Sequence, residues 1–157
     1  MMVPTSIDLS SEVQTKVAAE LQVLLADLID LSLQGKQAHW NVAGPLFQSV
    51  HVQLDSIVDD ARMWADDVAE RKVTIDLAAD GQPSDVATQS RLEPLPQGYI
   101  ADREAVALME RRVASVASHA RQAAERLGDL DLASQDLIIE IVRGLEKHQW
   151  MLRAQLR

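Results

Sequence analysis

The stretch KQAHWNVAGPLFQSVHVQLD, residues 36–55, decides how this chain folds. Gly44 and Pro45 interrupt a helical pattern there, because glycine often ends a helix and proline is favoured in the first helical turn. We therefore predict that one helix ends near His39 and that the next begins at Pro45. Helices joined by about five residues pack as antiparallel neighbours, so the stretch predicts a helical hairpin.

Hydrophobic residues recur at spacings of three and four in four long segments, which predicts four amphipathic helices. Gly128 is expected to end the third helix, and Ser134 is expected to cap the fourth. The first helix carries apolar residues on two faces, so it should pack against two partners. The predicted helices cover residues 11–39, 45–73, 101–127 and 134 to near the C terminus.

The connection between the second and third helices is much longer than the other two. It covers roughly residues 76–98 and holds three of the five prolines. A connection of that length can cross a whole bundle, and one long crossover in the middle favours the ferritin-like arrangement over a simple up-and-down one. We predict an all-α, ferritin-like four-helix bundle with a long middle crossover that has room for a short helix, and no strands.

Composition sets limits on the class of protein. The 157 residues, 47% of them hydrophobic, predict a single domain over 1–157, with a flexible N-terminal tail at 1–10. The absence of cysteine excludes thiolate metal sites and cysteine nucleophiles. With neither a signal peptide nor a membrane span recognisable, a cytoplasmic protein is expected. The net charge of −9 favours cation handling over nucleic-acid binding.

The second predicted helix carries two pairs of polar residues at a spacing of four, His51 with Asp55 and Asp66 with Glu70. Residues four apart share a helix face, and all four positions fall within a sector of roughly 100°. The midpoints of the two pairs are separated by about 22 Å at 1.5 Å per residue. One chain therefore cannot join both pairs at a single metal ion.

A second copy of the helix removes that obstacle. If two copies pack antiparallel about a two-fold axis near Asp60, each pair faces the other pair of the partner, and two symmetric sites result. His39 lies close enough in the hairpin to join. Imidazole and carboxylate ligands together suit Fe(II), Mn(II) or Zn(II) better than Ca(II) or Mg(II). None of the four histidines follows a glutamate by three residues, which argues against a di-iron centre inside one bundle.

The whole pattern resembles the signature of Dps proteins, the miniature ferritins. A histidine is followed at +12 by a second histidine, then at +4 by Asp, at +11 by Asp and at +4 by Glu, with no gap. The resemblance covers most of the chain, including the closing GLEKHQWML. It implies a homo-dodecameric shell that oxidises Fe(II), preferably with hydrogen peroxide, and stores the ferric product. The matching positions, which would form two iron sites per two-fold dimer interface, are His39, His51, Asp55, Asp66 and Glu70.

The resemblance also implies a role for each ligand. The pair at 66 and 70 would anchor the first iron, together with His39 of a neighbouring subunit. The pair at 51 and 55 would hold a second, weaker iron. Trp40 matches a tryptophan that the family keeps beside this centre, where it would take up stray oxidising equivalents. Asp136 and Asp131 would line a three-fold pore for iron entry, and Glu140, one turn further on, is a third candidate.

Two other functions stay open. The first is a DNA-compacting shell, which the N-terminal segment does not favour, because it offers only Lys16 against Asp8 and Glu12. The second is a metal-dependent amide or ester hydrolase, because a bound divalent ion can activate water. No nucleophile motif supports it. The sequence pattern assigns no functional role to His119 or His148. Trp64 and Trp150 are expected to be packing residues.

Overall fold

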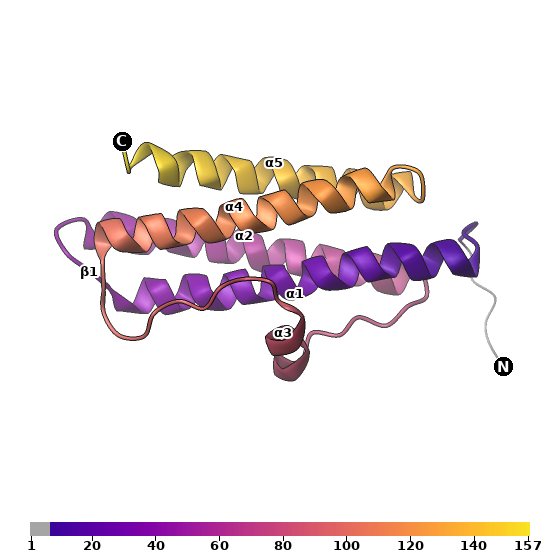
Figure 1. The fold of residues 1–157 in the computed structure, drawn as a ribbon, viewed down its shortest axis with the longest axis horizontal. Helices are drawn as coiled ribbons and strands as arrows, with labels where there is room; N and C mark the ends of the chain where they lie inside the picture. The colour runs from indigo at the N-terminus through magenta and orange to yellow at the C-terminus, as the bar shows by residue number, and fades with distance from the viewer. Residues whose placement is uncertain (1–6) are drawn as a thin grey trace.

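The computed structural model describes residues 7–157 and confirms the all-α, ferritin-like bundle. Four long helices lie side by side, and a fifth, short helix lies in the long crossover (Figure 1). The predicted tail falls partly on residues 1–6, which lie outside the described residues; beyond them, Ile7 and Leu9 pack against the core. The helices are α1 Ser11–Asn41, α2 Phe47–Thr74, α3 Pro83–Gln89, α4 Asp102–Leu127 and α5 Leu132–Ala154.

The helices pair as two hairpins, α1 with α2 and α4 with α5, and the crossover runs along the outside of α1 (Figure 1). Apolar side chains from all four long helices meet in one continuous core. The largest of them that are fully buried include Leu28, Leu54, Met109 and Ile141, one from each long helix. At about 1.5–3 kcal/mol for each large apolar side chain, this burial is the main force holding the bundle together.

Buried charges fasten the crossover to the bundle. Asp27 is completely buried in α1 and accepts hydrogen bonds from the backbone and guanidinium of Arg91 and from Nδ1 of His119 on α4, at 3.0 Å. Arg112 of α4 donates to the side chain of Gln34 and to the carbonyl of Pro94. Because a buried carboxylate is costly unless paired, these contacts fix where the crossover lies.

Two short strands correct the prediction of a strand-free chain. β1 Val42–Ala43 follows α1, β2 Ile100–Ala101 precedes α4, and the two pair in parallel. They join the end of the crossover to the loop of the first hairpin. A two-residue strand is too short to leave an alternating pattern in the sequence, which is why the prediction missed it.

Helix ends also differ from the prediction. The second helix begins at Phe47 and not at Pro45, which lies in the turn before it. Ser134 is the third residue of α5 and not its N-cap; Asp131 is the cap and accepts from the backbone N of Ser134. Gly128 does follow α4 as predicted, but with a right-handed backbone (φ −56°).

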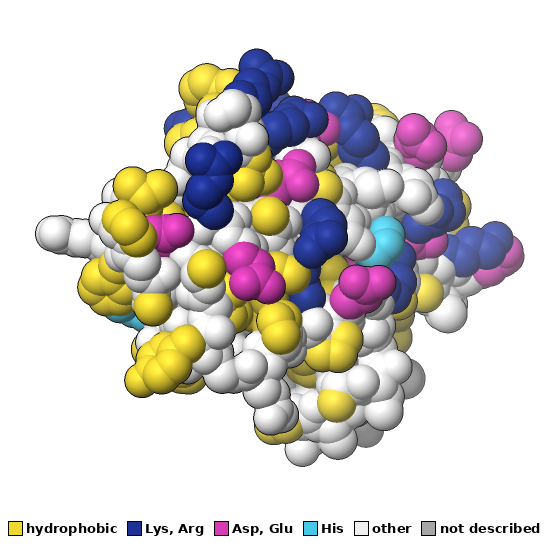
Figure 2. All heavy atoms as spheres, turned by 60° about the vertical axis from the view of Figure 1, so that its left-hand side comes forward, with side chains coloured by type: hydrophobic (Ala, Val, Ile, Leu, Met, Phe, Trp, Pro, Cys, Tyr) yellow, Lys and Arg dark blue, Asp and Glu magenta, His cyan; other side chains and the backbone are white. Residues whose placement is uncertain are grey.

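The surface carries exposed apolar residues as well as charge. Trp150 was expected to pack, but 62% of it is exposed in a single chain, so that prediction is wrong for the isolated subunit. Lys and Arg side chains gather toward the top of one end of the bundle, above scattered hydrophobic ones (Figure 2). Among residues 7–157, no helix is long and apolar enough to cross a lipid bilayer.

Candidate metal centre

The first hairpin brings His39, His51 and Asp55 together. His39 lies in the last turn of α1 and His51 in the second turn of α2. Their rings stack, with centroids 3.5 Å apart and planes inclined by 19°. Nδ1 of His39 lies 3.2 Å from Oδ1 of Asp55.

Each histidine donates a hydrogen bond across the hairpin to the backbone of the other. Nδ1 of His39 lies 2.8 Å from the carbonyl oxygen of His51, and Nδ1 of His51 lies 2.8 Å from the carbonyl oxygen of His39. A carbonyl oxygen can only accept, so both Nδ1 atoms carry the proton. In the neutral rings the lone pair is then on Nε2, which has no hydrogen-bond partner in the described part of the chain. The hairpin therefore presents two imidazole nitrogens ready to bind a metal.

The carboxylate of Asp55 is already paired with a lysine that the sequence pattern did not single out. Lys36 of α1 makes a very short ion pair with Oδ1 of Asp55. The hydrogen bond from Lys36, with smaller contributions from the two histidines, holds the pKa of Asp55 below its ordinary value of 3.8. Lys36 lies three residues before His39 on the same face of α1, and this spacing is the signal that could have found it. A metal ion at Asp55 has to displace or share with this ammonium group.

The second polar pair is in a different state. Asp66 and Glu70 are both exposed on α2, and neither carboxylate has an ion-pair or hydrogen-bond partner among residues 7–157. Four free carboxylate oxygens on successive turns are therefore available to an incoming cation. Within the described residues of one chain, no group of three His, Asp or Glu side chains is arranged to hold a metal ion by itself.

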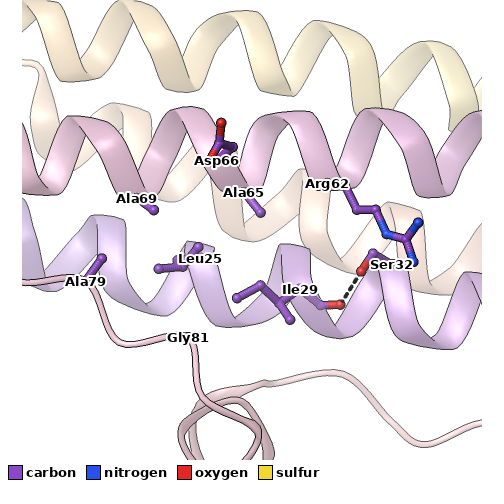
Figure 3. A pocket seen from close by; sticks show the side chains of 9 residues that line it. All are labelled: Leu25, Ile29, Ser32, Arg62, Ala65, Asp66, Ala69, Ala79 and Gly81. Atoms are coloured by element: carbon purple, nitrogen blue, oxygen red, sulfur yellow. Dashed lines mark hydrogen bonds between the residues drawn. The ribbon is translucent and has the colours of Figure 1, made fainter.

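Asp66 lies at the edge of an open groove between α1 and α2 (Figure 3). The groove has a volume of about 390 Å³. Leu25 and Ile29 line it from α1, Ala65 and Ala69 line it from α2, and the start of the crossover closes one side. Ser32 and Arg62 also line the groove, so the carboxylate borders a mostly apolar surface that a single subunit leaves partly open.

The other predicted site residues lie apart from these groups. Trp40 follows His39 directly and is 67% exposed. Asp136 and Glu140 are exposed on α5, with no partner in the described chain. Asp131 already has structural roles, because it caps α5 and forms an ion pair with Arg71 at 2.7 Å. Burial alone would raise the pKa of Asp131, but hydrogen bonds from Ser134 and Arg71 hold it below its ordinary value.

The remaining histidines have structural partners. Nε2 of His148 lies 2.6 Å from the carboxylate of Asp60, while its Nδ1 is buried without a hydrogen-bond partner. Trp64 packs edge-on to His148 and directly over Gly144, as expected for a packing residue. His119 pairs with Asp27, as described above.

Comparison with known proteins points in one direction. A family model described as a ferritin-like domain matches residues 18–157. The chain is 38% identical over 152 residues to a DNA protection during starvation protein of Mycolicibacterium smegmatis, covering 94% of this chain and 81% of that protein. It is 36% identical over 140 residues to the fine tangled pili major subunit of Haemophilus ducreyi, covering 89% and 74%.

A solved structure agrees with these sequence matches. The tetragonal form of Mycobacterium smegmatis Dps superimposes with a TM-score of 0.94 at 36% identity, over 100% of this chain and 95% of that one. At this level of identity and coverage, the chain shares with these relatives its amino-acid sequence as well as its fold.

Proposed function

This chain belongs to the Dps proteins of the ferritin-like superfamily, and on that basis we propose that it is a ferroxidase that stores iron in a shell. Iron is its substrate and its cargo. Fe(II) would bind where the histidine pair of one subunit faces the carboxylate pair of the next. The ferric product would collect inside a closed dodecamer.

The reciprocal hydrogen bonds between His39 and His51 carry this proposal. They place the proton of each neutral ring on Nδ1, which leaves Nε2 as the nitrogen that can bind a metal. A pair of histidines in a merely structural role has no need of two free ring nitrogens at one place. Asp66 and Glu70 supply the complementary half, because they are ionisable, exposed and unpaired among residues 7–157.

Carboxylates favour the ferric ion over the ferrous one, so ligation by Asp66 and Glu70 assists loss of an electron. Two Fe(II) ions give up two electrons, and one hydrogen peroxide takes them with two protons to form two waters. Taking both electrons in one event avoids release of a hydroxyl radical. Trp40, exposed beside His39, would take up an oxidising equivalent when only one Fe(II) is present.

The surroundings of Asp66 support a site shared by two subunits. The groove beside it is mostly apolar and open, as a surface that packs against a second copy would be. The two halves of the site are about 22 Å apart along α2, a distance that an antiparallel copy of the same helix spans. Iron would enter through pores lined by Asp136. Asp131 would contribute only if it gave up part of its pairing with Arg71.

Mixed assemblies test the shared site directly. We would coexpress a His39→Ala subunit with a subunit carrying Asp66→Ala and Glu70→Ala, each inactive alone. Random pairing restores about a quarter of the sites, because half the dimers are mixed and each mixed dimer regains one intact site. Peroxide-driven Fe(II) oxidation at about a quarter of the wild-type rate is expected. No recovery in mixed assemblies of proven composition would contradict a shared site.

The other two functions have separate tests. A DNA-compacting shell requires a DNA complex that weakens as salt rises, which a gel shift measures. In the structure Lys16, the one basic residue near the N terminus, lies in α1 and is paired with Glu12 at 2.6 Å. A hydrolase requires ester or amide turnover that needs metal but no oxidant.

A further inference from the structure

The loop between α1 and α2 is held from outside by one carboxylate. Asp102, the first residue of α4, is 7% exposed and accepts a hydrogen bond from the backbone N of Leu46, 2.6 Å from Oδ2. Its Oδ1 accepts from the backbone N of Arg103 at 2.7 Å. Leu46 is the N-cap residue of α2, and its own side chain makes no capping bond. Asp102 therefore caps α2 from a helix that begins 56 residues later in the chain.

The loop is shaped to receive this carboxylate. Gly44 has φ +134°, and a Cβ atom there would lie 2.6 Å from Oδ2 of Asp102. Glycine is thus required twice, for its backbone conformation and for the room it leaves. Beside it, β1 pairs with β2, so the residues just before Asp102 are bonded to the residues just before Gly44. A negative charge at the start of α2 is also favoured by the helix dipole.

The histidine pair lies on both sides of this loop. His39 is three residues before β1, and His51 is five residues after Leu46. Their two reciprocal hydrogen bonds require the end of α1 and the start of α2 to keep a fixed offset along the hairpin. The chain connects those two helix ends through the loop that Asp102 holds.

From this arrangement we infer that Asp102 is a positioning residue for the metal centre. It fixes the start of α2 against the end of α1, and so keeps His39 and His51 in the orientation that leaves both Nε2 atoms free. The inference rests on the proposed function, because it assigns Asp102 to the histidine half of that site. Within residues 7–157, Asp102 forms no hydrogen bond or ion pair with either ring, and it is not proposed as a ligand.

Binding of Zn(II), a probe that cannot be oxidised, tests the inference on the intact assembly. Asp102→Ala should weaken Zn(II) binding about tenfold, as loss of a group supporting a ligand does. Asp102→Asn should keep more of the affinity, because one side-chain oxygen can still accept from Leu46. Calorimetric titration gives the dissociation constants, measured well below the unfolding temperature of each variant.

Two glycine variants keep the inference testable if the Asp102 variants fail to fold. One is a second test of the same contact, and the other is its matched control. Gly44→Ala forces a methyl group against Asp102 and should weaken Zn(II) binding as Asp102→Ala does. Gly98→Ala places alanine at a similar left-handed backbone (φ +89°), with nothing within 4 Å of the new Cβ. Gly98→Ala should bind Zn(II) like the wild type, although it carries the same kind of backbone strain.

A double-mutant cycle separates positioning from general destabilisation. If Asp102 acts through the histidines, Asp102→Ala should cost little further affinity in a His39→Ala background. The inference would be overturned if the losses of Zn(II) affinity in Asp102→Ala and His39→Ala were fully additive. Wild-type affinity in Asp102→Ala and Gly44→Ala would overturn it as well. Neither result would count against the proposed iron site. Absence of Zn(II) binding by the wild type would instead overturn the proposed function, and the inference with it.

Discussion

Both halves of the proposed site include residues of α2, and His39 of α1 completes the histidine half, but the two halves depend on the fold to very different degrees. His39 and His51 are fixed by reciprocal backbone hydrogen bonds, and His39 is 7% exposed. Asp66 and Glu70 are exposed, and their carboxylates have no hydrogen-bond or ion-pair partner in the described chain. The histidine half is built before any metal or partner arrives, whereas the carboxylate half becomes a site only when something is brought to it.

Mutations in the two halves should therefore have different consequences. Loss of a histidine should cost both stability and function, because its hydrogen bonds are part of the hairpin. Loss of the carboxylates should cost function alone.

Asp66→Ala with Glu70→Ala should abolish catalysed Fe(II) oxidation and leave stability nearly unchanged. Exposed side chains without partners contribute within about 0.5 kcal/mol to unfolding. Stopped-flow absorbance of ferric iron and denaturant unfolding measure the two quantities. Asp59→Ala with Asp67→Ala removes two other exposed carboxylates from α2 and should leave the initial rate unchanged. A normal rate in the first variant would exclude these two ligands.

His39→Ala should both weaken metal binding and destabilise the fold. It removes the hydrogen bond that Nδ1 of His39 donates to the carbonyl oxygen of His51, at a net cost of about 0.5–1.5 kcal/mol. Zn(II) titration and denaturant unfolding of the same preparation measure both effects. If the stability were unchanged, the reciprocal hydrogen bonds would not hold the hairpin, and the contrast between the two halves would disappear.

Lys36→Met should tighten metal binding, because it frees Asp55 from an ion pair and removes a positive charge from the site. The gain should be modest, about two- to fivefold, since ion pairs exposed to solvent are weak. Lys147→Met, which removes the same charge from an exposed lysine of α5, is the control. Weaker binding in the Lys36 variant would mean that Lys36 orients Asp55 and does not compete with the metal.

The smallest effect concerns acid stability. Because the folded pKa of Asp55 lies below its ordinary 3.8, the ion pair with Lys36 stabilises the fold above that pH. This contribution is lost as the pH falls through the lowered pKa. The difference in unfolding temperature between wild type and Lys36→Met should therefore be smaller at about pH 3 than at about pH 6. Asp131, whose pKa is also lowered, adds an acid dependence of the same sign to the wild type and to the variant alike.

The sequence by itself determined the four helices, the hairpin at Gly44 and the long crossover. These follow from hydrophobic period and from chain-breaking residues, which act over a few neighbouring positions. It also placed His51, Asp55, Asp66 and Glu70 on one face of one helix, because helical geometry converts spacing into direction. The hydrogen-bond partners of those side chains could not be obtained in this way.

Only the tertiary structure decided which groups meet across the chain. The ion pair of Lys36 with Asp55 joins residues 19 apart, and the cap that Asp102 gives to Leu46 joins residues 56 apart. The exposure of Trp150 and the roles of His119 and His148 likewise depend on what the other helices bring beside them. Local patterns record which face a residue occupies, but a contact between distant segments exists only once packing has fixed their offset.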